Sequence, residues 1–260
     1  MKFRKLGYIS EVSDIKTKDN RHIKKGLLYR SSYFVRLKEN EIEEILKEFH
    51  LTDVIDLRTA EEINFYPEEH LFKGKVNYHN LPLVTEAINP ATNKENRLRV
   101  LDNIVKKKGG TKGHILTLYD GILFSDLAVS SYKEIFKIFL SNNGDKVIDI
   151  HCSQGKDRTG MTFYLLLSAL GVEEKRIKRF YLEFNRRSFF NRIIYFIGMV
   201  FGFGFKKAIA LNMILTARSS YFNYVIKEIK NKYQSVDNYL SNVIGLKEKD
   251  LEKLKNIYLE

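Results

Sequence analysis

The sequence predicts an α/β fold in which a mainly parallel central sheet is flanked by helices. Short apolar runs alternate with helical patterns up to residue 151, and residues 159–260 are almost entirely helical in pattern. A polar decapeptide, residues 151–160, follows a strand-like run and precedes a helical pattern. Strands that precede helices, with a functional loop at the carboxyl end of a strand, are typical of α/β proteins.

The first predicted helix and the first two predicted strands lie in the N-terminal third. Asn40 and Glu43 resemble a helix-capping arrangement. The helix that they open has one apolar face, formed by Ile42, Ile45, Leu46 and Phe49. Residues 52–57 and 76–81 are predicted strands.

The middle of the chain leads into the decapeptide. Residues 84–114 are polar and are predicted to form an irregular insertion. Residues 125–140 have helical spacing, and residues 146–151 form the strand that feeds the decapeptide.

The composition is that of one globular domain, which we assign to residues 1–260. The 260 residues are 44% hydrophobic and 29% charged, and 3 prolines leave no obvious linker. The single cysteine excludes an internal disulfide and fits a reducing compartment. No signal peptide or membrane span is visible, so we expect a cytoplasmic protein, with signal-independent export left open.

Cys152 lies at the predicted junction between strand and helix. A free thiol is only a few per cent thiolate near neutral pH, so a nucleophilic cysteine needs help. A helix N-terminus offers unpaired N–H groups and a positive dipole end, and both favour an anion. The same N–H groups can hold a phosphate against the sulfur. The position therefore suits a covalent reaction on a phosphate ester.

Arg158 and Gly155 strengthen this interpretation. Arginine offers a planar fork that binds two phosphate oxygens at once. Gly155 lets the loop turn where a side chain would crowd the phosphate. The alternative is an ordinary buried thiol, with Arg158 on the surface and Asp157 as a helix cap. That alternative leaves unexplained why these residue types fall together at one junction.

The residues present do not fit two other kinds of site. A nucleoside-triphosphate loop needs a glycine where this chain has Ile150, and Ser or Thr where it has Asp157. One cysteine and six scattered histidines give no metal-ligand spacing. We therefore expect neither a metal nor another cofactor.

The residues from His151 to Gly160 resemble the Cys-x5-Arg signature of cysteine-dependent protein tyrosine phosphatases. Their Gly-Lys-Asp-Arg-Thr-Gly ending is similar to the bacterial tyrosine/lipid phosphatase family. Further segments similar to that family are residues 28–32, residues 54–59 with Glu62, residues 165–172, residues 239–240 and residues 244–246. The resemblance implies a protein tyrosine phosphatase-like fold with a helical C-terminal region, in which residues 184–215 are a candidate lid. It also implies dual specificity, for phosphotyrosine and phosphoinositides.

The reaction that the resemblance implies is a double displacement. The Cys152 thiolate attacks phosphorus while Arg158 and the loop amides hold the equatorial oxygens, and water then hydrolyses the cysteinyl-phosphate. The chain has no tryptophan, so it lacks the Trp-Pro-Asp acid loop of many tyrosine phosphatases. The resemblance implies Asp157 as the acid, with helix capping as its alternative role. The other candidates for the acid are Asp56, Asp120 and Asp126.

The remaining loop residues have predicted supporting roles. Thr159 either hydrogen-bonds the sulfur or belongs simply to the first helical turn. His151 is expected to orient the loop through hydrogen bonds to its backbone. Lys156 either meets further phosphates of an inositol ring or is a solvated surface lysine. The predicted phosphate-binding set also contains Ser153, Gln154, Gly155 and Gly160, and the predicted supporting set contains Asp56 and Arg58.

Charge and hydropathy bear on partners. The formal net charge of +12 favours polyanions, but the basic residues are spread along helices and no nucleic-acid motif is evident. The run from Ile193 to Phe205 is apolar, flanked by Arg192 and Lys206, and shorter than the roughly 20 residues of a membrane span. It is interpreted as a lid, an interfacial helix on anionic lipid or a buried core helix.

We therefore expect a phosphatase of phosphorylated proteins or phosphoinositides, with an anionic membrane surface as a candidate partner and no nucleic-acid partner. The alternative from another class is a non-catalytic phosphate- or phosphoinositide-binding module. Cys152, Asp157 and Arg158 argue against that alternative, because a binding module has no need of a nucleophile.

Overall fold

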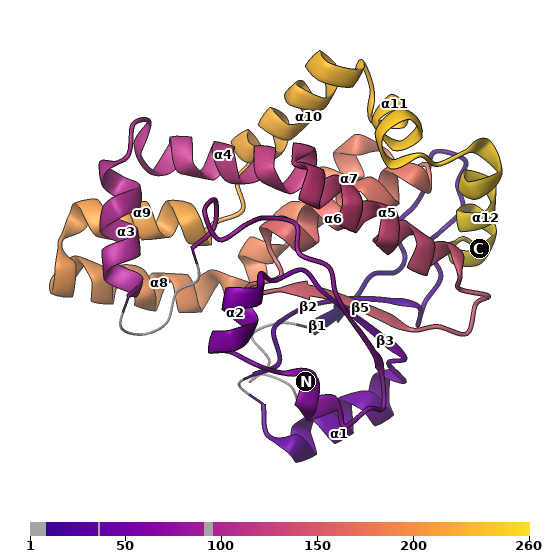
Figure 1. The fold of residues 1–260 in the computed structure, drawn as a ribbon, viewed down its shortest axis with the longest axis horizontal. Helices are drawn as coiled ribbons and strands as arrows, with labels where there is room; N and C mark the ends of the chain where they lie inside the picture. Colours follow the sequence, from indigo (N-terminus) through magenta and orange to yellow (C-terminus); the bar gives the residue numbers. More distant parts are fainter. Residues whose placement is uncertain (1–8, 36, 91–95) are drawn as a thin grey trace.

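The computed structural model describes residues 9–35, 37–90 and 96–260, in which a five-stranded sheet has helices on both faces (Figure 1). The strand order is β1-β2-β5-β3-β4. β1 runs antiparallel to β2, and the other three pairings are parallel. The strands are β1 (Ile9–Glu11), β2 (Leu28–Ser32), β3 (Asp53–Asp56), β4 (Asn77–Asn80) and β5 (Ile148–Cys152). The predicted α/β class with a mainly parallel sheet is confirmed.

Each face of the sheet buries its own hydrophobic cluster because side chains alternate along a strand. On one face, Tyr29 and Val54 pack against the apolar side of α1 (Glu39–Phe49). On the other face, Ile55 and Ile150 belong to the larger cluster. The helices that contribute buried residues to this larger cluster include α4 (Gly110–Phe124), α5 (Asp126–Leu140), α6 (Asp157–Ala169), α7 (Glu174–Leu182), α10 (Ser219–Tyr233) and α12 (Glu248–Tyr258).

The remaining elements connect or extend these layers. They are α2 (Ala60–Phe65), the short helices Glu69–Phe72, Val236–Tyr239 and Leu240–Ile244, α3 (Arg97–Lys106), α8 (Phe184–Phe203) and α9 (Phe205–Leu215). The helical pattern predicted after residue 159 is confirmed.

Two details of the predicted elements are wrong. The first helix begins at Glu39, and the Glu41 carboxylate accepts the backbone N–H of Lys38 at 2.8 Å, so Asn40 and Glu43 are not its capping pair. The predicted irregular insertion at 84–114 contains α3 and the start of α4 instead. Buried Leu101 and Ile104 give α3 its inward side, but charged neighbours conceal that spacing in the sequence. Residues 91–95 of this segment and residues 1–8 lie outside the described ranges.

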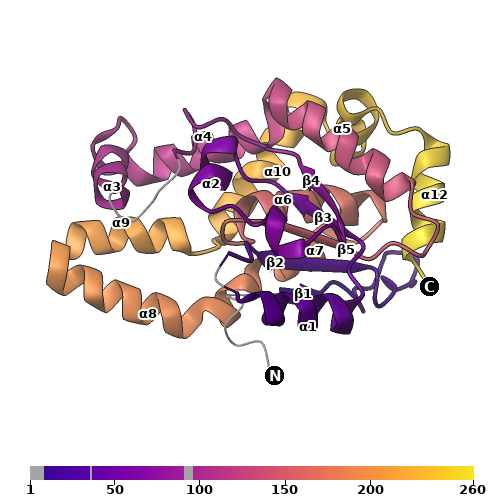
Figure 2. The ribbon, with the colours of Figure 1, turned by 60° about the horizontal axis from the view of Figure 1, so that its bottom comes forward.

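α8 and α9 form a helical hairpin that projects from the body of the molecule beside α3 (Figures 1 and 2). The interpretation of residues 193–205 as a buried core helix is wrong, because Ile194 and Phe201 are exposed. Among the described residues, the helices are all too short or too polar to cross a membrane.

Candidate active site

The sheet places Cys152 where the sequence predicts it, at the carboxyl end of β5. Cys152 is the last residue of the strand, and α6 begins at Asp157 after a four-residue turn. The neighbouring strands end at the same edge, where Ser32 of β2 pairs with Cys152 and Asp56 of β3 pairs with His151. The parallel strands therefore deliver side chains from three segments to one loop.

Gly155 holds this loop against β2. Its φ is +66°, in the left-handed region that favours glycine. A Cβ at this position would lie 2.1 Å from the carbonyl oxygen of Ser31. The close approach of β2 therefore requires glycine at this position, whether or not a phosphate is bound. Arg30 of β2 fixes the same turn by donating to the Gly155 carbonyl oxygen at 2.6 Å.

The thiol of Cys152 is buried, with 3% of the residue exposed, yet its surroundings favour the thiolate. Burial raises the pKa of Cys152. The positive charge of Arg158, and hydrogen bonds from the Thr159 side chain and from the N–H groups of Thr159 and Gln154, lower the pKa by more. The net shift is downward, as expected for a cysteine at a helix N-terminus.

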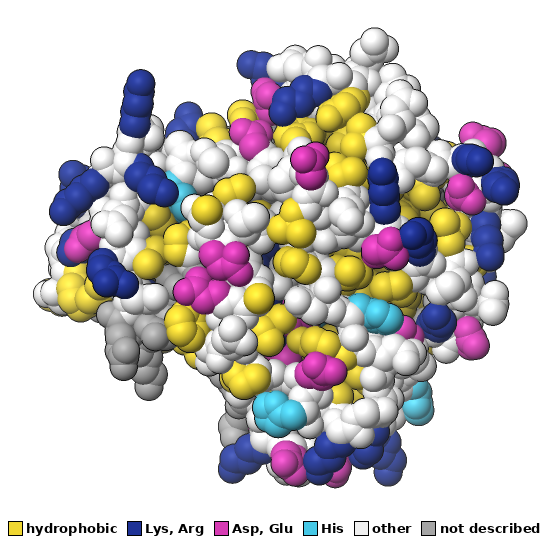
Figure 3. Space-filling model, in the orientation of Figure 1, with side chains coloured by type: hydrophobic (Ala, Val, Ile, Leu, Met, Phe, Trp, Pro, Cys, Tyr) yellow, Lys and Arg dark blue, Asp and Glu magenta, His cyan; other side chains and the backbone are white. Residues whose placement is uncertain are grey.

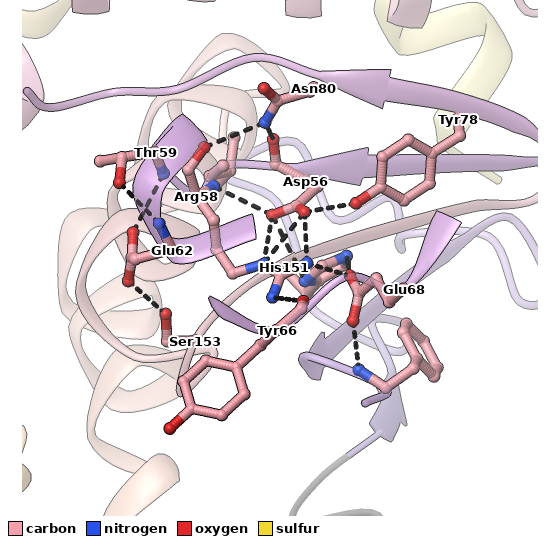
Figure 4. Close-up of polar contacts among 12 residues, drawn as sticks. Asp56, Arg58, Thr59, Glu62, Tyr66, Glu68, Tyr78, Asn80, His151 and Ser153 are labelled. Carbon is pink, nitrogen blue, oxygen red and sulfur yellow. Dashed lines mark hydrogen bonds and ion pairs between the residues drawn. The ribbon is translucent and has the colours of Figure 1, made fainter. Parts of the chain in front are cut away.

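Glu62 orients Arg158 through a bidentate ion pair. The two terminal nitrogens of Arg158 donate to the two oxygens of Glu62 at 2.5 and 2.8 Å, and one of them also donates to the carbonyl oxygen of Leu57 at 3.1 Å. The hydroxyl of Ser153 donates to Glu62 at 2.5 Å (Figure 4). Burial lowers the pKa of Arg158, but the Glu62 carboxylate raises it by more, so the guanidinium stays charged.

Glu62 is itself placed by the first turn of α2. The N–H of Thr59 donates to a Glu62 oxygen at 3.0 Å, and the N–H of Glu62 donates to the Thr59 hydroxyl at 3.2 Å. This is a capping box, in which two helix-end donors are satisfied reciprocally. Sequence reasoning assigned no role to Glu62, although the Thr59-x-x-Glu62 spacing is the pattern that indicates such a box.

Asp157, the predicted acid, lies at the start of α6 and is held by two neighbours. The Tyr119 hydroxyl donates to one Asp157 oxygen at 2.5 Å, and the Lys156 ammonium lies 3.2 Å from the other. The hydroxyl of Tyr181 lies 2.6 Å from that of Tyr119 and extends the contact inward. Neither tyrosine was predicted, because they come from α4 and α7 and no local motif marks them.

Lys156 is buried, with 2% of the residue exposed, so the prediction of a solvated surface lysine is wrong. Its ammonium donates to the carbonyl oxygen of Ile214 in α9. It also contacts Asp157 and lines the cavity beside Cys152. Lys156 thus connects the loop after β5 to the α8–α9 hairpin.

A second group of buried charges lies beneath the loop (Figure 4). Arg58 donates to Asp56 at 2.7 Å and lies 2.9 Å from an oxygen of Glu68. His151 Nε2 lies 3.0 Å from the same Glu68 oxygen, and the Tyr78 hydroxyl donates to Asp56 at 2.5 Å. The predicted contact of His151 with the loop backbone is therefore replaced by contacts with carboxylates. Burial lowers the pKa of His151, but the Glu68 and Asp56 carboxylates raise it to about 9.

Asp56, Glu68 and His151 have the donor types of a metal site and lie close together. Their arrangement does not fit a resident metal, because the Arg58 guanidinium already binds both carboxylates. Arginine supplies the positive charge that a cation would supply there.

The site opens into a cavity of about 430 Å³. Cys152, Asp157 and Arg158 are among its polar lining residues. Its apolar wall is formed by residues of α3, α4, α8 and α9, among them Leu101, Ile115, Met199, Leu211 and Ile214.

The four aspartates predicted as candidates for the acid differ in whether they line the cavity. Asp157 lines the cavity together with Cys152. Asp56 is buried and bonded to Arg58, which is the structural role that the sequence left open. Asp120 accepts the Tyr224 hydroxyl at 2.9 Å, and Asp126 is the exposed first residue of α5. Neither Asp120 nor Asp126 lines the cavity.

Of the remaining predicted phosphate-binding residues, Ser153 and Gln154 line the cavity. Thr159 is buried beside Cys152, and its hydroxyl helps to lower the pKa of the thiol. Gly160 packs against Tyr181, since a Cβ at this position would lie 3.0 Å from the ring. The structure thus gathers the predicted loop residues around one thiol.

The mainly parallel sheet and the loop after β5 define a protein tyrosine phosphatase-like protein. A family model described as "Tyrosine phosphatase family" matches residues 3–260, so the chain belongs to this family. A Cupriavidus necator protein named "Putative tyrosine-protein phosphatase" is 29% identical over 241 residues, which make up 92% of this chain and 81% of that protein. Family membership supports phosphatase activity in general.

Asp149→Asn tests the buried charges of β5. Burial raises the pKa of Asp149 to about 7, whereas an unfolded aspartate titrates near pH 4. The folded state therefore keeps a proton that the unfolded chain loses, and this costs stability as pH rises from about 4 to about 7. Asparagine does not titrate, so its variant is spared this loss. We therefore expect the free energy of unfolding of the variant to rise relative to that of the wild type as the pH rises from about 4 to about 7, by at most about 4 kcal/mol.

Urea unfolding at pH 4, 5.5 and 7 measures this difference. Asparagine keeps an acceptor for the Ser31 hydroxyl, which donates to Asp149 at 2.8 Å. The exposed Asp145→Asn variant is the control and should follow the wild type. Parallel curves for Asp149→Asn and wild type would show that the carboxyl is not protonated in the fold.

Proposed function

We propose that the chain is a cysteine-dependent phosphatase that hydrolyses phosphate monoesters through a cysteinyl-phosphate intermediate. The observation that carries the proposal is the position of Cys152 and Arg158 on one cavity, with the thiol pKa lowered by the guanidinium. A thiolate beside a fixed arginine and helix-end N–H groups is suited to attack on a phosphate dianion.

In the first step, the sulfur of Cys152 forms a bond to phosphorus as the bond to the leaving oxygen breaks. Asp157 gives its proton to that oxygen, so the alcohol departs neutral. Arg158 and the backbone N–H groups of the loop hold the non-bridging oxygens. In the second step, water attacks phosphorus and returns a proton to Asp157, and phosphate leaves as the thiolate is restored.

The contacts of Asp157 support its assignment as the acid and base. Tyr119 and Lys156 hold the carboxylate at the cavity that Cys152 also lines. A fixed carboxylate within reach of the scissile oxygen is the geometric requirement for proton transfer.

The proposed substrates are phosphotyrosine residues, phosphoinositides or both. The apolar wall of the cavity suits the aromatic ring of phosphotyrosine. Lys156 supplies a buried ammonium that suits a second phosphate of an inositol ring. If the substrates are phosphoinositides, the proposed partner is an anionic membrane surface. We assign the lid over the cavity to residues 184–215, that is α8 and α9.

The second candidate function is a non-catalytic phosphate-binding module. The enclosed loop and Arg158 would serve it equally well. The lowered pKa of Cys152 favours the enzyme, because phosphate binding alone gains nothing from a thiolate beside the anion.

Cys152→Ser decides between the two functions. Serine keeps the size of the side chain and lacks the nucleophilic thiolate, so hydrolysis of p-nitrophenyl phosphate should fall at least about 10³-fold. Binding of inorganic phosphate, measured by calorimetry, should persist. A wild-type protein that binds phosphate but turns over no aryl phosphate at any pH would establish the binding module instead.

Asp157→Asn tests the proton donor. We expect kcat for phenyl phosphate, whose leaving group needs a proton, to fall about 10²- to 10⁴-fold. The loss should be much smaller for p-nitrophenyl phosphate, whose leaving group is stable as an anion. The exposed Asp126→Asn variant is the control. Equal losses on both substrates would remove Asp157 from the role of acid.

The Lys156→Met variant tests whether Lys156 binds a second phosphate of a phosphoinositide substrate. Methionine keeps much of the apolar stem and removes the charge, so kcat/KM for a soluble polyphosphorylated phosphoinositide should fall about tenfold or more relative to that for an aryl phosphate. A panel of soluble phosphoinositides and phosphotyrosine peptides measures the ratio. If both classes of activity fell by the same factor, the ammonium would serve only to organise the loop and the hairpin.

A further inference from the structure

The outer side of α8 is apolar where a projecting helix would normally be polar. Phe190, Ile194, Ile197 and Phe201 recur at the spacing of one helix face. They are 78%, 69%, 50% and 88% exposed. In the described part of the chain, all but one of the exposed large hydrophobic side chains lie between residues 189 and 209. An exposed patch of this extent marks an interaction surface.

The opposite side of α8 already has a function. Arg192, Tyr195 and Met199 line the cavity, and at 100° per residue they lie across the helix from the outer stripe. The stripe is therefore not needed to close the cavity, and no described element covers it.

The hairpin that carries the stripe is basic. Between residues 184 and 215 the sequence has five lysine or arginine residues and no aspartate or glutamate. Arg186 and Lys206 are exposed near the two ends of the stripe. Lys207 of α9 is paired with Asp102 of the adjoining α3 at 2.8 Å. Figure 3 shows further lysine and arginine side chains over α3, which packs on α9, with an acidic side chain among them.

We propose that the α8–α9 hairpin docks on an anionic lipid bilayer, with the stripe Phe190–Ile194–Ile197–Phe201 in the interface and with Arg186 and Lys206 on the headgroups. An interfacial helix combines an apolar face with flanking lysine and arginine, and its affinity grows with buried apolar area and with anionic lipid. A bilayer satisfies both features of the hairpin at once.

A second copy of the chain would cover the apolar stripe but would not balance the positive charge of the hairpin. In a two-fold contact along the stripe, the two α8 helices run either antiparallel or parallel; in a parallel pair, Arg186 meets Arg186 and Lys206 meets Lys206. In an antiparallel pair, each end brings Arg186 of one copy toward Lys206 of the other, so like charges oppose both arrangements. The charge pattern therefore favours lipid phosphates over another hairpin.

Docking at a bilayer has a consequence for the proposed phosphatase site. The hairpin that carries the stripe also provides Ile214, whose carbonyl oxygen accepts the Lys156 ammonium. A hairpin lying on lipid therefore keeps the cavity, which the other side of α8 lines, close to the bilayer surface. This last step rests on the proposed function, whereas docking itself does not.

Co-sedimentation with vesicles tests the docking. The two vesicle types are phosphatidylcholine alone and phosphatidylcholine with about 30% phosphatidylserine; neither contains a phosphoinositide, so binding does not depend on the active site. We expect the full chain to partition onto the anionic vesicles at least about tenfold more strongly. The Phe190→Ser/Phe201→Ser variant and the Arg186→Glu/Lys206→Glu variant should each lose at least about tenfold of that partitioning.

The matched control is Lys249→Glu/Lys253→Glu, which makes the same change in net charge on exposed residues of α12, at the opposite end of the molecule (Figure 1). It should bind vesicles like the wild type. Equal circular dichroism spectra and thermal melts show that each variant is folded.

Three results would overturn the docking. They are equal partitioning of the wild type on both vesicle types, hairpin variants that bind anionic vesicles as tightly as the control, and a dimer in light scattering that Phe190→Ser/Phe201→Ser dissociates while vesicles capture nothing. Vesicle binding by a chain without phosphatase turnover would overturn the proposed function and leave the docking in place.

Discussion

The bidentate pair between Arg158 and Glu62 is the interaction on which the site depends. It joins the first turn of α6 to the first turn of α2 at 2.5 and 2.8 Å. Both side chains are largely buried, and a buried charge is tolerated only when it is paired. Removal of either partner would leave the other charge unpaired, at a cost of about 3–5 kcal/mol. The pair also keeps the guanidinium beside Cys152, where it lowers the pKa of the thiol.

A second layer of paired charges supports the first. Arg58 contacts Asp56 and Glu68, and His151 contacts Glu68 from the other side. His151 is protonated near neutral pH because the surrounding carboxylates raise its pKa to about 9. Two cations and two carboxylates thus balance beneath the loop. A balanced set of this kind fixes the ends of β3 and β5 relative to one another, and with them the direction of the loop.

The local part of the site follows from the sequence, because Cys152, Lys156, Asp157 and Arg158 belong to one strand, turn and helix start. The conformation of such a segment is set by contacts between residues that are close in the sequence. The contacts of Glu62, Glu68 and Tyr119 depend on which distant segments the chain brings beside the loop, and no periodic pattern carries that information. The burial of Lys156 was missed for the same reason, since its partner Ile214 lies on a helix more than fifty residues away. α3 was missed because its charged residues outnumber the apolar ones that face inward.

Gly155 has a consequence for how this chain can vary. The atom that a side chain at position 155 would meet is the main-chain oxygen of Ser31, 2.1 Å away. A clash with a side chain can be relieved by a smaller residue elsewhere, but every amino acid has the same carbonyl oxygen. No second-site substitution at position 31 can therefore make room, so the constraint on position 155 has no local compensation. Any lineage that loses this glycine has to move β2 or the loop as a whole, and with it the cradle around the thiol.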